Sequence, residues 1–283
     1  MRKKWTKLIS FATVLMTLML ILSGCGSNSN NASSTSNSRS VAQIKKRGTI
    51  KVAVFGDLPP YGWVNKDGKR VGYDVTLAHK IAKDLGVKLK FVQVNANNRV
   101  DALNANKVDI ILANFTVTKA RRDVVDFAKP YMKVSVGVIS PKNKAITEPK
   151  QLQGKNLIVT KGTTAENYFT SKQPKVDLLK FDSKTQQFNA LKNNRGVALA
   201  DDNSYLYAWV KNNPNYTVGI KSIGPKQYIS PAVKKGNKSL LNWTNKEITK
   251  LNKQGFFTDD YNSQLKPYFG SEVKPNDIIL PQK

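Results

Sequence analysis

The sequence is poor in the residues that most often carry catalysis and metal binding. It contains one cysteine, Cys25, and one histidine, His79, among 283 residues. A single cysteine excludes an internal disulfide. His79 falls among lysines on a predicted helix, where an exposed side chain is a more ordinary interpretation than a catalytic one. Because no metal-ligand spacing and no glycine-rich phosphate loop is present, we expect no enzymatic activity, no metal and no cofactor.

Acidic residues are also scarce. The chain has 19 of them against 46 lysines and arginines, which gives a formal charge of +27. So basic a chain suggests nucleic acid as a partner, but the lysines are scattered and no DNA- or RNA-binding motif is present. We therefore expect no nucleic-acid partner. A cell-envelope polyanion, an anionic membrane surface or host matrix is the expected counter-surface.

The amino terminus is typical of an export signal. Four basic residues precede an apolar stretch, Leu8 to Leu22, which is too short and too interrupted for a confident membrane span. Small residues then lead to Cys25, which resembles a bacterial lipobox with cleavage before the cysteine and lipid on its sulfur. A plain secretory peptide with an incidental cysteine is the alternative. Removal of residues 1–24 takes away four positive and no negative charges and leaves +23.

Residues 25–40 are rich in Asn and Ser and nearly free of apolar side chains, which predicts a flexible tether. From Val41 onward, short apolar strands alternate with amphipathic helices. Asp74 is expected to cap one of these helices. The pattern starts at Thr49–Phe55 and starts again at Asn156–Thr160. Two successive blocks of this kind predict an α/β fold with two doubly wound lobes.

One strand end has the composition of an anion site. The β-branched run Val108–Ala113 predicts a buried strand, and Thr116 and Thr118 follow it. A predicted helix then begins near Lys119. Arg121 can hold a carboxylate with two parallel hydrogen bonds. A solvated basic helix start is the alternative interpretation.

Ligands of open α/β sheets bind beyond the carboxyl ends of the strands. Polar residues follow predicted strands in both blocks: Tyr61 and the segment 114–121 in the first, Thr163, Thr164, Asp201 and Asp202 in the second. If the blocks face each other, an arginine and an aspartate meet across a cleft. That pair would complement a zwitterion.

At these residues the chain resembles the polar amino-acid-binding proteins of bacterial ABC importers, which have the periplasmic-binding-protein-like type II fold. The resemblance covers about residues 41–280. The segments that carry it are Gly56-Asp-Leu-Pro-Pro-Tyr-Gly-Trp63, Gly72-Tyr-Asp74, Asn114-Phe-Thr-Val-Thr118 with Arg121, Asp126-Phe127, Lys161-Gly-Thr-Thr-Ala-Glu166 and Asp202.

The resemblance implies a role for each of these positions. Arg121 would bind the ligand α-carboxylate, assisted by Thr116 and by the Thr163–Thr164 segment. Asn114 would offer a carbonyl to the ammonium, and Asp202 would neutralise it. The other implied ligand-binding residues are Tyr61, as a pocket wall, Phe115, in the core or the pocket wall, and Arg99, in the cleft. The implied partners are a free L-amino acid and a membrane permease.

Finer similarity points to the cysteine-binding branch of the family. It rests on Val54-Phe-Gly-Asp57, Asn98-Arg-Val100, Ile111-Leu-Ala-Asn-Phe115, Tyr131-Met-Lys-Val134, Ala208-Trp-Val-Lys211 and Pro231-Ala-Val-Lys-Lys-Gly236. Cysteine or cystine is the expected ligand. Glutamate or aspartate is the alternative, because binders of acidic amino acids share Arg99. The branch includes basic lactobacillar surface proteins regarded as adhesins for collagen or mucus, so adhesion is a further expectation.

The family also implies a division of the chain. Lobe 1 would comprise residues 41–137 and 230–283, lobe 2 residues 138–229, and two extended crossings would act as a hinge. The protein would be anchored by lipid to the outer face of the cell membrane, in a Gram-positive organism. The aromatic residues Trp209, Phe256, Phe257 and Tyr261 are expected in core or lobe packing rather than in the site.

Overall fold

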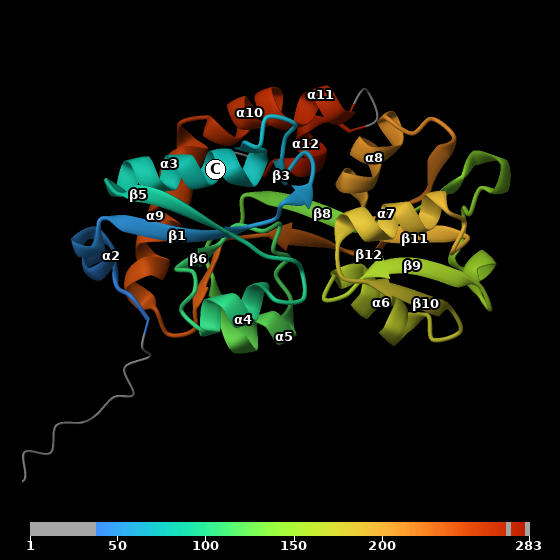
Figure 1. Ribbon diagram of the computed structural model, residues 1–283, viewed down its shortest axis with the longest axis horizontal. Helices are drawn as coiled ribbons and strands as arrows, with labels where there is room; N and C mark the ends of the chain where they lie inside the picture. Colours follow the sequence, from blue (N-terminus) through green and yellow to red (C-terminus); the bar gives the residue numbers. More distant parts are fainter. Residues whose placement is uncertain (1–37, 270–272, 281–283) are drawn as a thin grey trace, which may run out of the picture. The chain divides into compact units, whose positions relative to one another are not determined.

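Two five-stranded sheets flanked by helices organise the part of the chain that the computed structural model describes, residues 38–269 and 273–280 (Figure 1). Both sheets belong to one compact unit, Ser36–Lys283. The predicted signal peptide, Cys25 and all but the last three residues of the tether lie outside the described residues. Within the described ranges, no helix combines the length and the apolar character that a bilayer crossing requires.

Lobe 1 is built on a sheet in which β13 returns from late in the chain to lie between β6 and β7. β1 pairs in parallel with β5 and β6, whereas β13 is antiparallel to both of its neighbours. The strands, in sheet order, are β5 (Lys88–Gln93), β1 (Thr49–Val54), β6 (Ile110–Ile111), β13 (Ala232–Lys234) and β7 (Val125–Phe127). The helices of this lobe include α2 (Val41–Arg47), α3 (Tyr73–Leu85), α4 (Arg99–Asn104), α5 (Lys119–Val124) and α9 (Lys238–Lys253). The small sheet of β2 (Asp57–Leu58), β3 (Gly62–Val64) and β4 (Arg70–Val71) lies between β1 and α3 in sequence.

Two local predictions in lobe 1 were wrong in detail. The run Val108–Ala113 is buried as expected, but only Ile110–Ile111 forms a strand. The chain turns away at Asn114, which adopts a left-handed φ of 43°. Asp74 does not cap α3, because the helix begins at Tyr73 and Gly72 takes the capping position.

Lobe 2 is built on a second mixed sheet. Three strands are parallel, and the long strands β8 and β12 complete the sheet in antiparallel pairing. The strands, in sheet order, are β10 (Asp177–Phe181), β9 (Asn156–Thr160), β11 (Ala198–Asp202), β8 (Met132–Pro141) and β12 (Tyr216–Ile229). The helices of this lobe are α6 (Thr164–Lys172), α7 (Lys184–Lys192) and α8 (Asn203–Lys211). The predicted α/β fold with two lobes is confirmed.

β8 and β12 also form the connection between the lobes (Figure 1). They pair from Tyr216↔Pro141 to Ile229↔Met132, with three register shifts along the way. At the Met132 end both strands are tied into lobe 1. In β12, Ile229 bridges Thr116, and the Ser230 N–H that follows donates to the Phe115 carbonyl; in β8, Met132 bridges Ile279. A pair of strands that lies in one sheet and is anchored in the other is suited to act as a hinge.

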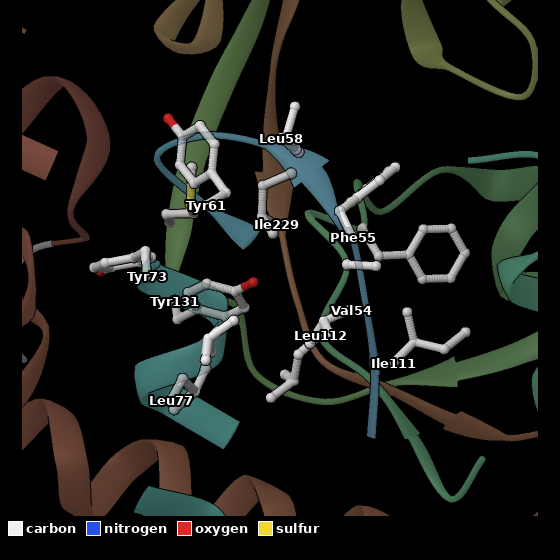
Figure 2. Close-up of a cluster of buried hydrophobic side chains, with 14 of the residues drawn as sticks. Val54, Phe55, Leu58, Tyr61, Tyr73, Leu77, Ile111, Leu112, Tyr131 and Ile229 are labelled. Atoms are coloured by element: carbon white, nitrogen blue, oxygen red, sulfur yellow. The ribbon is translucent and has the colours of Figure 1, made fainter. Parts of the chain in front are cut away.

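The core of lobe 1 includes Ile229, the residue through which β12 contacts this lobe. Figure 2 shows Tyr61, Tyr73, Tyr131 and Leu77 packed near Ile229. Phe257 stacks on Tyr131 with ring centroids 5.8 Å apart. The predicted packing role of the later aromatic residues is confirmed, since Phe257 and Tyr261 are buried and Trp209 and Phe256 pack against the core. The tail is helical, in α10 (Phe256–Asp260), the π-helical turn η3 (Tyr261–Leu265), α11 (Lys266–Phe269) and α12 (Pro275–Ile278).

Candidate functional site

A small cavity lies where the carboxyl ends of strands from both lobes converge. Lobe 1 contributes Phe55, Leu58, Ala96, Arg99, Asn114, Thr116 and Arg121, and lobe 2 contributes Thr163, Thr164, Lys184, Asp201 and Asp202. The lining includes seven of the nine ligand-binding residues expected from the sequence. The two others, Tyr61 and Phe115, lie beside it rather than in its wall.

Arg121 is held in place by backbone oxygens. Thr118 caps α5 by accepting a hydrogen bond from the Arg121 N–H at 3.2 Å. The guanidinium donates from Nη1 to the Thr116 carbonyl at 2.6 Å and from Nη2 to the Gly162 carbonyl of lobe 2 at 2.8 Å. Burial lowers the pKa of Arg121 to about 10, and the nearby Asp202 opposes this effect. The side chain is therefore charged at pH 7.

A second guanidinium, that of Arg99, also lies against the Phe115 ring. Arg99 begins α4, is only 3% exposed, and donates from Nη1 to the Ala113 carbonyl at 2.8 Å. Its guanidinium carbon is 4.2 Å from the centre of the Phe115 ring, and that of Arg121 is 4.9 Å from the same ring. Phe115, itself buried, thus supports both cations by cation–π contact. Burial, followed by repulsion from Arg121, lowers the pKa of Arg99 well below its usual value.

Asn114 links the two lobes. Its left-handed backbone is fixed by Asp74, whose Oδ2 accepts the Asn114 N–H at 2.8 Å. The side-chain amide of Asn114 donates to Asp202 Oδ2 at 2.8 Å. Its Oδ1 is buried and accepts no hydrogen bond from the described residues. An acceptor left in this state beside a carboxylate is suited to receive a cation such as an ammonium group.

Asp74, expected to be a helix cap, instead supports the site from behind. It is 1% exposed, and the Tyr131 hydroxyl donates to its Oδ1 at 2.6 Å. Burial raises the pKa of Asp74 to about 7, although the hydrogen bonds from Tyr131 and Asn114 oppose this effect. Its two hydrogen bonds place the strand end that carries Asn114.

The carboxylates of lobe 2 have different surroundings from each other. Asp201 accepts hydrogen bonds from Lys184 Nζ at 2.5 Å and from Gln187 Nε2 at 2.6 Å, so its charge is balanced within the lobe. Asp202 has no lysine of its own and faces Asn114 of lobe 1. Burial, and then the charge of Asp201, raise the pKa of Asp202 to about 6. Asp201 thus pairs with Lys184 of its own lobe.

The start of α6 closes the remaining side. The Thr163 hydroxyl caps the helix, accepting the Glu166 N–H at 3.1 Å and donating to the Thr160 carbonyl at 2.7 Å. The Thr164 N–H lies in the first turn, where helix N–H groups lack an intrahelical partner. Gly162 approaches lobe 1 so closely that an added Cβ would lie 2.7 Å from the Ala96 carbonyl oxygen.

Tyr61, expected as a pocket wall, makes a contact between the lobes instead. It is fully buried, and its hydroxyl donates to Ser204 Oγ of lobe 2 at 2.6 Å. A further hydrogen bond runs from the Thr185 N–H to Asp57 Oδ2 at 3.2 Å. These bonds hold the lobes together around the cavity. Arg122, by contrast, is exposed, as expected for the neighbour of Arg121.

Several lining residues were missed from the sequence. Lys184 was overlooked because a lysine at a helix start usually signals a solvated position. Phe55, Leu58 and Ala96 gave only a hydrophobic signal, which does not separate a core from a cavity wall. No group of three or more His, Cys, Asp and Glu side chains that could hold a metal occurs within the described ranges. The geometry brings cations from lobe 1 close to Asp202 of lobe 2, a carboxylate without a lysine or arginine in salt-bridge contact among the described residues.

Comparison with known proteins agrees with this geometry. The family model for bacterial extracellular solute-binding proteins, family 3, matches residues 50–267. A crystal structure of the solute receptor for L-cysteine of Neisseria gonorrhoeae is 51% identical and covers 86% of this chain and 100% of its own, with a TM-score of 0.84. The cysteine-binding protein of Campylobacter jejuni is 48% identical, covering 85% and 98%, with a TM-score of 0.83. The glutamine-binding protein of the Bacillus subtilis ABC transporter is 30% identical over 267 residues, or 92% of this chain and 97% of that protein.

Proposed function

The chain belongs to the bacterial extracellular solute-binding proteins, family 3, a family of non-enzymatic proteins, and we propose that it captures a free amino acid for an ABC importer, with cysteine as the preferred ligand. One observation carries this proposal. Arg121 of lobe 1 and Asp202 of lobe 2 line the same small cavity. An amino-acid zwitterion offers a carboxylate to the first and an ammonium to the second.

The carboxylate half has unused donors. Nη1 and Nη2 of Arg121 each donate one hydrogen bond to a carbonyl, and each nitrogen carries a second hydrogen. The Thr116 side chain and the Thr164 N–H lie at the same cavity. The ammonium half consists of Asp202 and the unpartnered Asn114 Oδ1. Since the halves lie on different lobes, the ligand binds the closed form more tightly than the open form and shifts the population toward closure.

Two observations favour cysteine among the amino acids. The two structures with the higher identities described above are of proteins described as binding cysteine. The cavity is small, and an apolar wall of Phe55, Leu58 and Ala96 faces its charged groups. Such a wall suits a short sulfur-containing side chain better than a long polar one. Cystine, glutamate and aspartate remain the competing ligands to be tested.

The other expected partners follow from the same role. We propose that Cys25 carries a lipid which holds the protein at the outer face of the cell membrane. The closed lobes would then dock on a membrane permease. Hinge motion along β8 and β12 would distinguish the loaded from the empty protein for that permease.

A thermal-shift panel tests the proposal. Cysteine under reducing conditions, cystine, glutamate, aspartate, glutamine and serine are added separately to the purified protein. A ligand at one hundred times its dissociation constant stabilises the folded state by about 2.7 kcal/mol. Cysteine should give the largest increase in melting temperature. If no amino acid raises it, the proposal is wrong.

A second function is favoured by a groove that shares no lining residue with this cavity. Lys144, Lys155 and Arg195 line it, and no carboxylate does. With the excess of basic residues, this groove fits an anionic cell-wall polymer. Retention of the protein on a polyphosphate column should fall steeply between low and moderate salt, and charge reversal at the three positions should weaken it. Adhesion to collagen or mucus would be retained at a salt concentration that releases the polymer.

A further inference from the structure

We infer that the cavity binds its amino acid with a second negative charge on the side chain, and that cysteine is therefore bound as the thiolate. This inference rests on the proposed function. It concerns the ionisation state of the ligand, which neither the family nor the relatives specify.

The first argument is the charge balance of the cavity wall. Three cations, Arg99, Arg121 and Lys184, and two carboxylates, Asp201 and Asp202, line it. Lys184 and Asp201 compensate each other at 2.5 Å. The remaining wall has two cations and one carboxylate. A zwitterion has no net charge, so after its carboxylate meets one cation and its ammonium meets Asp202, one cation is left over.

The second argument identifies that cation as Arg99. Its Nε is buried without a hydrogen-bond partner among the described residues, and only the Ala113 carbonyl accepts from its Nη1. The rings of Phe115 and Phe55 lie 4.2 and 6.0 Å from its guanidinium carbon. A buried charge in this condition is unfavourable unless an anion approaches it.

The charged groups around Arg99 do not supply that anion. Arg121 repels it, whereas Asp202, Asp201 and Asp74 attract it. Each of these three carboxylates already has a partner. Asp74 accepts from Tyr131 and from the Asn114 backbone, Asp201 from Lys184 and Gln187, and Asp202 from the Asn114 side chain. No salt bridge joins Arg99 to a carboxylate within the described part of the chain.

The third argument is the chemistry of short anionic side chains. A thiolate and an aspartate carboxylate share the required charge. The wall formed by Phe55, Leu58 and Ala96 favours sulfur, because a sulfur atom is larger and more polarisable than an oxygen atom and a thiolate is less strongly hydrated than a carboxylate. A free thiol has a pKa of about 8.5, and a neighbouring guanidinium lowers it. On binding, the S–H bond breaks, the proton passes to buffer, and the sulfur accepts a hydrogen bond from Arg99.

Proton release measured by calorimetry tests the inference directly. The full chain is titrated with cysteine at pH 7, under a non-thiol reductant, in two buffers with different heats of ionisation. About one proton should be released per cysteine bound, because nearly all free cysteine is protonated at sulfur at this pH. Aspartate, whose second charge is already present, and serine, which has no ionisable side chain, should release almost none. They also correct for any titration of Asp202 or Asp74.

A ratio of affinities gives an independent measurement. Between pH 6 and pH 8 the affinity for cysteine, divided by that for aspartate, should rise roughly 80-fold, following the thiolate fraction of a group with a pKa of about 8.5. Titration of protein groups affects both ligands and largely cancels in the ratio.

Variants at Arg99 add a structural control. Arg99→Gln should abolish proton release and flatten the ratio, whereas Arg99→Lys, which keeps the charge, should retain both in part. Arg122→Gln removes an exposed arginine from α5 and should change neither. Both wild-type measurements stand even if an Arg99 variant fails to fold.

The outcomes separate this inference from the proposed function. If no amino acid binds, the proposed function fails. If cysteine binds without releasing a proton and the affinity ratio does not change with pH, the thiolate is excluded while the proposed function stands. Binding of aspartate without cysteine would likewise overturn the assignment of the thiolate.

Discussion

The two halves of the cavity handle their charges in opposite ways. In lobe 2, Asp201 has a buried lysine and a glutamine as partners, so that half is largely balanced before any ligand arrives. In lobe 1, Arg99 and Arg121 rest on carbonyl oxygens and on the Phe115 ring, with no carboxylate of their own lobe in salt-bridge contact in the described part of the chain.

This difference separates stability from affinity. Breaking a balanced pair leaves an uncompensated charge in the folded protein, whether or not ligand is present. Removing Arg99 or Arg121, which have no carboxylate partner in their own lobe among the described residues, removes mainly a contact with the ligand. We therefore expect changes in the balanced half to act on folding and changes in the unbalanced half to act on binding.

The largest effect is expected at Lys184. Lys184→Met should lower the free energy of unfolding by about 4 kcal/mol without ligand, because Asp201 is left buried without its cation. Chemical denaturation checks this. Lys180→Met is the matched control, since the Lys180 side chain is 41% exposed and its pair with Glu166 should contribute less than about 1 kcal/mol. If both variants lost the same free energy of unfolding, the buried Lys184–Asp201 pair would not be more important for folding than an exposed one.

Arg121 should show the reverse behaviour. Arg121→Gln should weaken ligand binding by more than a hundredfold, or about 3 kcal/mol, because a bidentate charged contact is lost. The melting temperature without ligand should change little. Arg122→Gln serves as the control and should leave the dissociation constant unchanged. If Arg121→Gln lost much of its stability without ligand but kept its affinity, the expectation that lobe 1 cations act mainly on binding would be wrong.

Asp202 belongs to lobe 2 but faces the arginines of lobe 1. Its effect on stability should therefore depend on pH. Its pKa rises from 3.8 to about 6 on folding, so the folded protein holds this proton more tightly than the unfolded chain. That contribution favours folding below pH 3.8 and is lost as the pH rises through 6. Asp202→Asn should thus stabilise the unliganded protein at pH 7 by about 2 kcal/mol, and hardly at pH 4.

The same substitution should weaken binding of the ligand ammonium at pH 7. Wild-type affinity should fall as the pH drops below 6, whereas that of Asp202→Asn should stay nearly flat. Melting curves and titration calorimetry at both pH values test the pair of effects. A destabilised Asp202→Asn protein at pH 7 would show that the carboxylate is better compensated than its surroundings suggest.

The smallest effect is expected where the lobes touch without ligand. Tyr61→Phe removes the 2.6 Å hydrogen bond to Ser204 Oγ and should weaken ligand binding by about 1 kcal/mol, roughly fivefold, because that bond joins the two lobes and would be lost if they separated. Ser204→Ala should give a similar loss, and the double variant little more. Fully additive losses would show that the two hydroxyls act independently.

The sequence located the charged ends of this site because they follow a general rule. Ligands lie beyond strand carboxyl ends, and Arg121 and Asp202 both follow predicted strands. Strand–helix alternation likewise predicted two α/β lobes, because hydrophobic periodicity is a local property.

The supporting residues were not accessible in the same way. Asp74 has the spacing of a helix cap, and only the folded chain shows that its carboxylate holds Asn114. Lys184 becomes a buried partner only because β11 brings Asp201 to the start of α7. The run Val108–Ala113 looks like a six-residue strand, yet its ladder ends at Ile111 since the backbone turns at Asn114. Such features depend on long-range contacts that no local pattern encodes.

Gly162 determines how closely lobe 2 can approach lobe 1. Its carbonyl receives a hydrogen bond from Arg121, and its missing side chain leaves just enough room for the backbone at Ala96. The methyl group of an alanine at this position would collide with the backbone of residues 96 and 97, which cannot move aside as a flexible side chain could, and would hold the lobes apart. We therefore expect the ligand affinity to depend on the absence of a Cβ atom at residue 162.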